Sequence, residues 1–291
     1  MTCPYCRQES RFLFQASDLN QRSSTEMFRY RRCRACLLTF IERIPENLAR
    51  YYINEQYDIP EDAAGFGPRS ESQRWKVEIL KSLVPPCPLL EVGPATGEFA
   101  LAARNDGYLP KLLEMDENCC RFLRDALGME VVKTAEPAAW LASSVQFSAI
   151  CIWQAIEHVP DFWKLMENAA ARLAPGGVLL LSTPNPASLQ ARLLGRFWPH
   201  LDAPRHLYLI PQTWMQAFGR KHGLDVVLDT TRDVGSLALN GYAWYLAVRN
   251  AIGREHMNKG VEYATAGLAT ALRPWEALEG WGCSYTVAFR R

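Results

Sequence analysis

The sequence predicts an α/β protein built on a doubly wound parallel sheet, with a small metal-binding module before it and a helical insertion ahead of the last strand. From about residue 71 onward, short apolar runs alternate with helical patterns, which is typical of parallel strands covered by helices on both faces. Four cysteines, placed as two pairs near the N-terminus, predict a separate module held together by a metal ion.

The composition is that of a globular chain and excludes several other classes. The chain has 291 residues, of which 48% are hydrophobic and 22% charged, so a disordered chain is excluded. The 32 basic and 31 acidic residues give a net charge of +1, which argues against a nucleic-acid binder. We expect a cytoplasmic protein, because there is no apolar run of transmembrane length and no run typical of a signal peptide.

The N-terminal cysteines form two CxxC pairs. Cys3 and Cys6 make the first pair, and Cys33 and Cys36 make the second. Two CxxC turns supply the four sulfurs of a closed tetrahedral Zn²⁺ site, which leaves no coordination position open. We therefore expect a structural zinc in a ribbon-like module spanning residues 1–45. A redox-active pair is the alternative, but two pairs favour a metal.

The 26 residues between the two pairs are expected to form a hairpin with an exposed polar tip at residues 15–28. A cluster of arginines lies beside the second pair, and it would either bind a phosphorylated or acidic partner or form a solvated face. The cluster consists of Arg29, Arg31, Arg32 and Arg34.

Residues 46–70 are predicted to be a linker, because prolines and glycines interrupt any long element there. The main domain is then expected over residues 71–233. Helical spacing is found over residues 71–83, 98–105, 117–127 and 162–173, and short apolar runs are found over residues 88–92, 109–114, 129–133, 147–153 and 178–182.

A glycine-rich turn, residues 93–97, directly follows the first of these strands. In a doubly wound sheet the ligand lies beyond the carboxyl ends of the strands, where the strand order reverses. Glycine lets the backbone approach a ligand closely, and the helix that follows offers free N–H groups. Glu114 lies 21 residues after Gly93, which is the position of a carboxylate that binds ribose hydroxyls.

The C-terminal segment, residues 234–291, is predicted to hold two helices and a final strand. Residues 234–272 are rich in alanine, leucine, tryptophan and tyrosine, and the final strand spans residues 284–289. The helices are expected to cap the site or to form a dimer surface, so a homodimer is possible. A membrane-facing amphipathic pair is a further alternative.

The glycine turn and its flanking residues resemble a known family motif. The stretch LLEVGPATGEF, residues 89–99, resembles motif I of the class I S-adenosylmethionine-dependent methyltransferases, which usually reads hydrophobic-hydrophobic-[DE]-x-G-x-G-x-G. Glu91, Gly93 and Gly97 match this pattern. Ala95 stands where the middle glycine is usual, a small change that still allows close approach.

Three further features follow in the family's order. Glu114 falls 17 residues after Gly97, where the family has its ribose-binding acid. QAIEHVPD at residues 154–161 resembles the family's stretch after the fourth strand, and LAPGGVLLLSTPN at residues 173–185 resembles its fifth strand. The motifs cover about residues 72–230 and distinguish this chain from a nicotinamide dehydrogenase. They imply a Rossmann-like methyltransferase fold with S-adenosyl-L-methionine as cofactor.

The resemblance implies a role for each residue of the first motif. Gly93, Ala95 and Gly97 would form the floor under the amino-acid part of the cofactor. Glu91 would orient this turn or meet the cofactor ammonium.

Other cofactor contacts are implied by the later strands. Glu114 would bind the ribose hydroxyls, and Met115 would pack on the adenine. Glu136 stands where the family contacts the adenine amino group, although the usual aspartate is absent and Glu136 could simply begin a helix. Gln154 would face the methionine part of the cofactor.

The acceptor side has three candidate catalytic residues. Glu157 and His158 lie beside the cofactor in the family, and His158 would act as a base or as a packing residue. His206 is the strongest candidate for a general base, because a histidine titrates near neutral pH. It lies on the loop of residues 199–208, which resembles the subgroup pattern "W…D.PRHL" and also carries Tyr208. The alternative is that Arg205 and His206 brace this loop against the core.

The two-CxxC module resembles the zinc-binding domain of a methyltransferase subgroup that is found in polysaccharide and natural-product pathways. The resemblance implies methyl transfer to a small biosynthetic acceptor, natural-product-like or sugar-like, with Tyr52 and Tyr57 as a lid. One alternative is cyclisation or another alkyl transfer from the same cofactor. Another is an RNA or protein methyltransferase docked through the zinc module, although no nucleic-acid partner is expected from the net charge.

Overall fold

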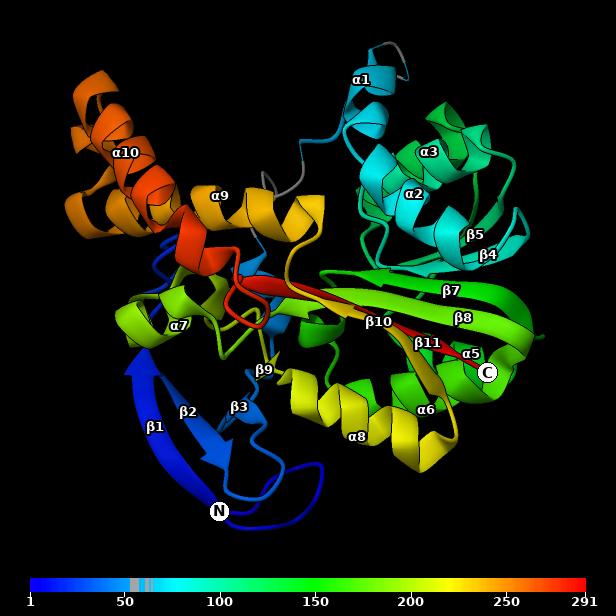
Figure 1. Cartoon of the computed structure of the whole chain (residues 1–291), viewed down its shortest axis with the longest axis horizontal. Coiled ribbons are helices and arrows are strands. Elements are labelled where there is room, and N and C mark those ends of the chain that lie inside the picture. The colour runs from blue at the N-terminus through cyan, green and yellow to red at the C-terminus, as the bar shows by residue number, and fades with distance from the viewer. Residues whose placement is uncertain (53–57, 61–62, 64) are drawn as a thin grey trace.

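The computed structural model describes residues 1–52, 58–60, 63 and 65–291 and contains a large and a small β-sheet (Figure 1). The strands are β1 (Ser10–Ala16), β2 (Phe28–Cys33), β3 (Thr39–Ile41), β4 (Pro88–Val92), β5 (Leu109–Glu114), β6 (Glu130–Lys133), β7 (Phe147–Trp153), β8 (Leu173–Pro184), β9 (Tyr208–Leu209), β10 (Asp225–Thr230) and β11 (Ser284–Arg290). The α-helices are α1 (Phe66–Glu71), α2 (Arg74–Leu83), α3 (Glu98–Asn105), α4 (Glu117–Arg121), α5 (Pro137–Ala142), α6 (Phe162–Arg172), α7 (Leu189–Leu194), α8 (Gln212–His222), α9 (Val234–Ile252) and α10 (Lys259–Glu276).

The large sheet has seven strands in the order β10-β11-β8-β7-β4-β5-β6. Strands β4 to β8 pair in parallel, whereas β11 is antiparallel to both β8 and β10. From β4 the chain winds first toward β6 and later, through β7, toward β10. The strand order therefore reverses between β4 and β7, and the predicted doubly wound fold is confirmed.

The apolar runs form strands because the sheet is buried on both faces. In β8, Val178 and Leu180 belong to the core cluster with α2, whereas Leu179 and Leu181 belong to the cluster with α6. Successive side chains of a strand point to opposite faces, so a strand covered on both sides is apolar throughout. Figure 1 shows α2 and α3 on one face of the sheet, and α5, α6 and α8 on the other.

Several element boundaries differ from the expected ones. The helix expected over residues 117–127 is α4 followed by a π-helical turn, Phe122–Ala126. Strand β8 begins at Leu173 rather than at Val178, because Gly176 and Gly177 pair with the carboxyl-terminal Arg291. Helix α8 and strand β10 had no counterpart in the sequence prediction.

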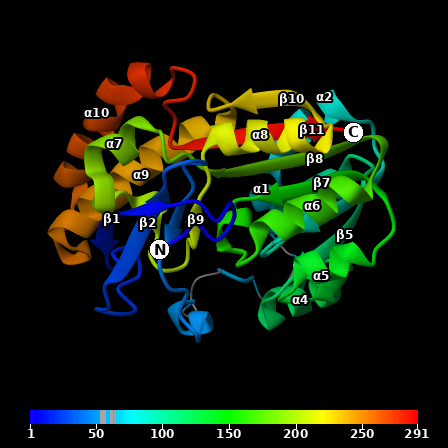
Figure 2. The same cartoon turned by 90° about the horizontal axis from the view of Figure 1, so that it is seen from below.

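The small sheet joins the N-terminal module to the main domain. Its order is β1-β2-β3-β9, with the predicted hairpin formed by β1 and β2. The fourth strand comes from a loop of the main domain, where Tyr208 pairs with Phe40 and Leu209 pairs with Thr39. This pairing covers the free edge of β3. Figures 1 and 2 place the small sheet at one end of the molecule, with β5 and α5 at the other.

The prediction of an exposed hairpin tip over residues 15–28 is wrong for Asp18 and Asn20, which contact the main domain. Asp18 is 2% exposed and accepts hydrogen bonds from Arg205. Asn20 donates to the carbonyl of Pro199 at 2.8 Å and to Asp202 Oδ1 at 2.6 Å. The tip is buried because the guanidinium of Arg205 is itself fully buried and requires acceptors.

Part of the arginine cluster is neutralised within the module. Arg29 and Arg31 both contact Glu42, at 3.3 and 3.2 Å. Arg34 lies 3.6 Å from Glu9 in an exposed pair. These contacts leave less free positive charge for an external partner than the sequence indicated.

The C-terminal segment contains the two predicted helices, α9 and α10, followed by β11. Glu276 anchors α10, since its carboxylate accepts hydrogen bonds from Gln190 and Trp244. Figure 1 shows α10 projecting from the body of the molecule. Among the described residues, none of the helices is both long and apolar enough to cross a bilayer.

We predict that Asp18→Asn lowers the free energy of unfolding by about 3 kcal/mol, because it removes one carboxylate from a fully buried guanidinium. Glu26→Gln, which alters the exposed contact with Arg50, is the matched control and should stay within about 1 kcal/mol of the wild type. Urea denaturation measures both. Equal losses in the two variants would contradict the importance assigned to the buried pair.

Candidate functional site

The glycine turn that follows β4 is compressed against its neighbours. Gly93 and Gly97 have φ values of +72° and +85°. A Cβ atom on Gly97 would lie 2.4 Å from the Cδ2 of Leu123, and one on Gly93 would lie 2.7 Å from the Cβ of Ala155. Gly93 therefore requires glycine for space as well as for backbone conformation, whereas at Gly97, where the end of the Leu123 side chain can shift, the positive φ is the stronger reason. Ala95 has a φ of +51°, a left-handed conformation that alanine adopts at some energetic cost.

Glu114 connects this turn to the end of β5. Its carboxylate accepts hydrogen bonds from the backbone N–H groups of Ala95, Met115 and Asp116, at 3.0, 2.7 and 2.8 Å. Burial raises the pKa of Glu114, and the three backbone donors oppose that shift. Oε1 accepts two of these hydrogen bonds and Oε2 accepts one, so Oε2 keeps a lone pair that can accept from a ribose hydroxyl. Glu114 thus has a structural role in the turn, and its ribose contact stays a prediction.

The other predicted cofactor residues lie along the same edge of the sheet. Met115 is 56% exposed and available to a flat ring. Glu136 is exposed and immediately precedes α5, farther along the edge beyond β6. Gln154 follows β7, and its Nε2 donates to Ser182 Oγ at 3.1 Å and to Ser284 Oγ at 2.8 Å. The amide of Gln154 is therefore fixed by β8 and β11.

Glu91 is a buried carboxylate at the start of the turn. Within the described part of the chain, its Oε2 has no hydrogen-bond partner, and burial raises its pKa to about 8. Lys76, which the sequence analysis did not single out, lies 5.1 Å from the ring centroid of Trp153. Burial lowers the pKa of Lys76, and the charge of Glu91 opposes that shift. The free oxygen of Glu91 fits the ammonium group of an amino-acid ligand.

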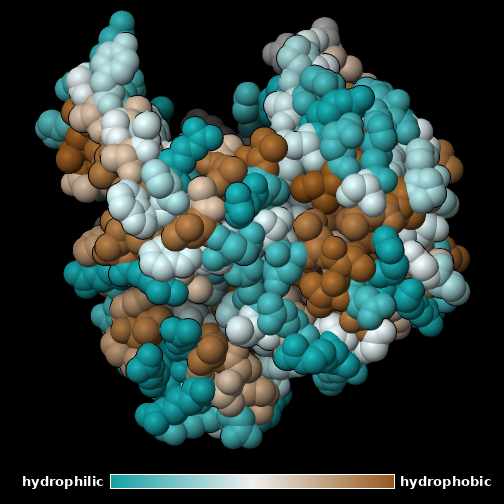
Figure 3. Space-filling model, viewed as in Figure 1, coloured by the Kyte–Doolittle hydropathy of each residue, from teal (hydrophilic) through white to brown (hydrophobic). Residues whose placement is uncertain are grey.

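A cavity of about 360 Å³ lies beside Gln154. Its walls come from α2, from the ends of β7, β8 and β11, and from α9. Figure 3 shows the surface hollowed between the arm formed by α9 and α10 and the helices α1 and α2. The residues that line the cavity include Trp75, Lys76, Gln154, Ser182, Leu239 and Ser284.

His158 and His206 meet at the far side of this edge. Their ring centroids are 4.6 Å apart and the rings are nearly perpendicular. Nδ1 of His206 lies 2.7 Å from the carbonyl of His200, and Nδ1 of His158 lies 3.0 Å from the carbonyl of Arg205. Burial lowers the pKa of His206 to about 3 and also lowers the pKa of His158. Both rings are therefore neutral at physiological pH.

Glu157 is a third member of this group; the resemblance places it beside the cofactor with His158 but gives it no role. It is fully buried, and its Oε1 lies 3.9 Å from Nε2 of His206. Thr183 donates to its other oxygen at 2.9 Å. Burial raises the pKa of Glu157 to about 8. The only sequence signal was its place beside His158 in the EHV motif.

Arg205 holds the loop that carries His206. It donates to Asp202 at 2.9 and 2.6 Å, to Asp18 at 3.1 and 2.8 Å, and to the carbonyl of Tyr51 at 3.0 Å. Although burial opposes it, the hydrogen bonds from Arg205 lower the pKa of Asp202 to about 2. Arg205 therefore braces the loop against the core, which is the alternative given for it in the sequence analysis.

Comparison with known families identifies the family of this chain. Residues 41–228 match a family model described as "Methyltransferase domain". The chain belongs to this methyltransferase family. It is an enzyme that uses S-adenosylmethionine, and the free oxygen of Glu91 together with the glycine cradle fits that cofactor.

Solved structures of low sequence identity share the fold of this methyltransferase. One is a SAM-dependent methyltransferase from Archaeoglobus fulgidus, with 16% identity, a TM-score of 0.52, and coverage of 76% of this chain and 94% of that chain. Another is the [4+2]-cyclase SpnF, with 14% identity, a TM-score of 0.51, and coverage of 76% and 81%. Coclaurine N-methyltransferase has 11% identity, a TM-score of 0.50, and coverage of 86% and 80%. A search of curated proteins finds no match to this chain.

Tyr208, the third predicted catalytic residue, has the contacts of a packing residue in this methyltransferase. Its hydroxyl donates to the carbonyl of Pro160 at 2.7 Å, and its ring packs against Phe162 and Trp163. The hydroxyl is therefore not directed at the two histidines. Of the two tyrosines expected to form a lid, Tyr52 lies with its oxygen 3.0 Å from Nδ1 of His158, and Tyr57 lies outside the described residues.

The four N-terminal cysteines come together at the base of the hairpin. Sγ of Cys3 lies 3.8 Å from Sγ of Cys36, and Sγ of Cys6 lies 3.4 Å from Cys33 and 3.6 Å from Cys36. A tetrahedron with bonds of 2.3 Å to its centre has edges of roughly 3.8 Å. These sulfurs therefore fit a zinc ion.

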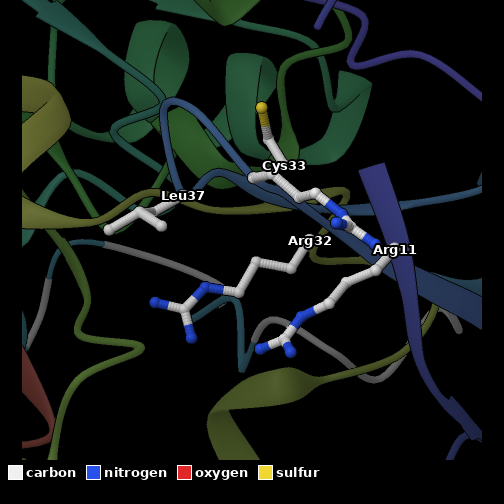
Figure 4. Close-up of a pocket in the computed structure, with 5 residues that line it drawn as sticks. Arg11, Arg32, Cys33 and Leu37 are labelled. Atoms are coloured by element: carbon white, nitrogen blue, oxygen red, sulfur yellow. The ribbon is translucent and has the colours of Figure 1, made fainter. Parts of the chain in front are cut away.

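A basic pocket adjoins the cysteine cluster on the surface of the module. It is lined by Arg11, Arg32, Cys33, Arg34 and Leu37. Figure 4 shows the sulfur of Cys33 pointing away from the guanidinium groups of Arg11 and Arg32. The pocket is thus separate from the space between the four sulfurs.

The raised pKa of Glu91 predicts a pH-dependent stability of the cofactor-free enzyme. A carboxyl that stays protonated in the fold stabilises it fully below its unfolded pKa, and this contribution disappears as the pH rises toward about 8. The unfolding free energy of the wild type should therefore fall relative to that of Glu91→Gln between about pH 5 and about pH 8. Glu71→Gln, at an exposed glutamate, is the control. A parallel pH dependence of Glu91→Gln and the wild type in urea denaturation would rule out this account.

Proposed function

We propose that this methyltransferase transfers a methyl group to a small biosynthetic acceptor, natural-product-like or sugar-like. The main support is the cavity of about 360 Å³ beside Gln154, which is in the size range of small-molecule sites. Its lining combines an indole, a lysine and hydroxyl groups, and α9 forms one wall. Such a lining suits a compact acceptor with both apolar and hydrogen-bonding groups.

The cofactor residues have distinct tasks in this proposal. S-adenosylmethionine supplies an activated methyl group, so the protein has mainly to position the acceptor in line with it. Glu91 binds the amino-acid ammonium through its free oxygen, and Glu114 binds the ribose while it holds the glycine turn. Met115 covers the adenine, and Glu136 lies at the rim of that site.

We place the reacting end of the acceptor at His158, His206 and Glu157, which do not line this cavity; Glu157 and His158 follow β7 a few residues after Gln154. Methyl transfer breaks the bond from carbon to sulfur, leaves the electron pair on sulfur, and forms a bond from carbon to the acceptor atom, which gives up its proton. Both histidines are neutral, so each can take a proton or a ligand through its free Nε2. Because its hydroxyl is engaged with Pro160, Tyr208 has no part in the proposed step.

The first test is to incubate the enzyme with S-adenosylmethionine alone and with a panel of small hydroxylated, aminated and sugar-nucleotide acceptors. We expect S-adenosylhomocysteine, detected by mass spectrometry, only when an acceptor is present. Consumption of the cofactor to methylthioadenosine without any acceptor would instead indicate cyclisation or another alkyl transfer. Methylation of RNA or of a protein would indicate a macromolecular substrate.

Glu114→Ala should weaken cofactor binding by about tenfold or more, since hydrogen bonds to a charged group contribute about 1.5–3 kcal/mol each. Glu130→Ala, at an exposed residue of the neighbouring strand β6, is the matched control. Calorimetry measures affinity, and circular dichroism checks the fold. Unchanged affinity in the folded Glu114→Ala protein would refute the ribose assignment.

We also propose that Cys3, Cys6, Cys33 and Cys36 bind a structural Zn²⁺. The module has little core of its own, so metal binding would supply part of its folding free energy.

Cys33→Ser should lower the zinc content by about one ion per chain and destabilise the hairpin. Cys87→Ser, at a half-buried cysteine outside the module, should leave the zinc content unchanged. Elemental analysis measures the metal in both variants. Equal zinc contents would contradict the assignment.

A further inference from the structure

The side chains of Glu157, His158 and His206 lie close together at the proposed acceptor end. One ring nitrogen from each of His158 and His206 and one carboxylate oxygen of Glu157 all lie within 4.8 Å of one another. The oxygen concerned, Oε1 of Glu157, is buried, and no described residue donates a hydrogen bond to it. A buried polar atom of this kind calls for a specific explanation, such as an ion.

The backbone sets the tautomer of both rings. A carbonyl oxygen can only accept, so Nδ1 of His206 donates to His200. Nδ1 of His158 lies 3.0 Å from both the carbonyl of Arg205 and the hydroxyl of Tyr52, and the tautomer that satisfies the carbonyl donates from Nδ1. In a neutral ring this leaves Nε2 with a lone pair. Histidines that bind metals are typically oriented in this way, with the other ring nitrogen donating to a carbonyl or a carboxylate.

Within the part of the chain that the structure describes, no lysine or arginine forms an ion pair with Glu157. Arg205 is the nearest guanidinium along the chain, and its Nε, Nη1 and Nη2 are engaged by Asp18, Asp202 and Tyr51. The carboxylate of Glu157 is held in place by Thr183 through its other oxygen. Two imidazole nitrogens and a carboxylate oxygen, held within 4.8 Å of one another, are groups that a metal cation binds.

We propose that Glu157, His158 and His206 form a second metal site, which binds a divalent first-row transition metal such as Zn²⁺, Fe²⁺ or Co²⁺. Two imidazoles and one carboxylate are a ligand set for such metals and leave coordination positions open. The separation of 3.9 Å between Nε2 of His206 and Oε1 of Glu157 is less than twice a metal–ligand bond of about 2.1 Å. A metal ion can therefore bridge the two atoms.

The open positions of this site would bind an oxygen atom of the acceptor, and this role rests on the proposed function. A metal-bound hydroxyl loses its proton more readily, because the positive charge stabilises the oxyanion. The inferred acceptor class is therefore a hydroxylated or enolisable molecule that ligates the metal. In this arrangement the two histidines hold the metal and do not act as bases.

The test uses the full-length enzyme with its cysteine site loaded with zinc, and dialyses it against Co²⁺ without cofactor or acceptor. Soft thiolates retain zinc, so elemental analysis distinguishes the two sites. We expect one Co²⁺ per wild-type chain in addition to zinc. Glu157→Gln should lower the affinity for Co²⁺ by at least about 100-fold, because even residues that only orient metal ligands contribute 10–100-fold.

His222→Gln is the matched control, since His222 also lies near a glutamate, 4.0 Å from Glu167, but outside the cluster. It should bind Co²⁺ like the wild type. Co²⁺ should also raise the melting temperature of the wild type and leave that of Glu157→Gln unchanged. Because glutamine is neutral and similar in shape, this variant should fold without metal.

Two results would overturn the inference: a wild type that takes up no Co²⁺ beyond its zinc, or a Glu157→Gln variant that binds Co²⁺ equally well. Neither result depends on turnover. Metal binding without methyl transfer would support the metal site and contradict the proposed function. Methyl transfer without a second metal would support the proposed function and contradict the metal site.

Discussion

The buried ion pair between Arg205 and Asp18 is the constraint on which both parts of the molecule depend. A fully buried guanidinium is tolerated only when acceptors surround it, and here they come from the hairpin tip, from Asp202 and from the carbonyl of Tyr51. The loop that carries His206 can therefore adopt its position only when the hairpin is folded against it. The hairpin that carries the cysteines at its base is joined to the loop of His206 by the contacts of Arg205 with Asp18. The pairing of β3 with β9 adds a second connection.

Two buried carboxylates mark the two ends of the site. Glu91 lies at the start of the glycine turn and Glu157 lies at the acceptor end, and each has one oxygen without a partner among the described residues. Such groups destabilise a fold that contains no ligand, so their presence is better explained by binding than by stability. In the proposals made above, the ammonium of the cofactor binds to Glu91 and a metal ion binds to Glu157. Buried polar atoms without a hydrogen-bond partner are expected at functional sites, because a ligand supplies the missing partner.

The sequence predicted the large sheet and the cofactor turn well, because both depend on local patterns. A strand buried on both faces is apolar along its whole length, and the turn requires glycine at Gly93 and Gly97 for reasons of local space and conformation. It failed at the hairpin tip, since a polar segment such as residues 15–28 looks exposed until its partner is known. Lys76 was missed for a similar reason, because burial of a charged residue leaves no local pattern. The meeting of Glu157 with His206 was not predicted either, since the two residues are far apart in the sequence.

The sequence by itself therefore determined the family and most strands of the large sheet, and it predicted residues that would bind the cofactor and the zinc ion. These follow from periodicity, from glycine and cysteine spacing, and from motifs that span a few residues. Only the tertiary structure decided how the N-terminal module meets the acceptor loop and which side chains share the acceptor site. The reason is distance along the chain: Asp18 and Arg205 are 187 residues apart, and their contact depends on the whole fold that brings them together.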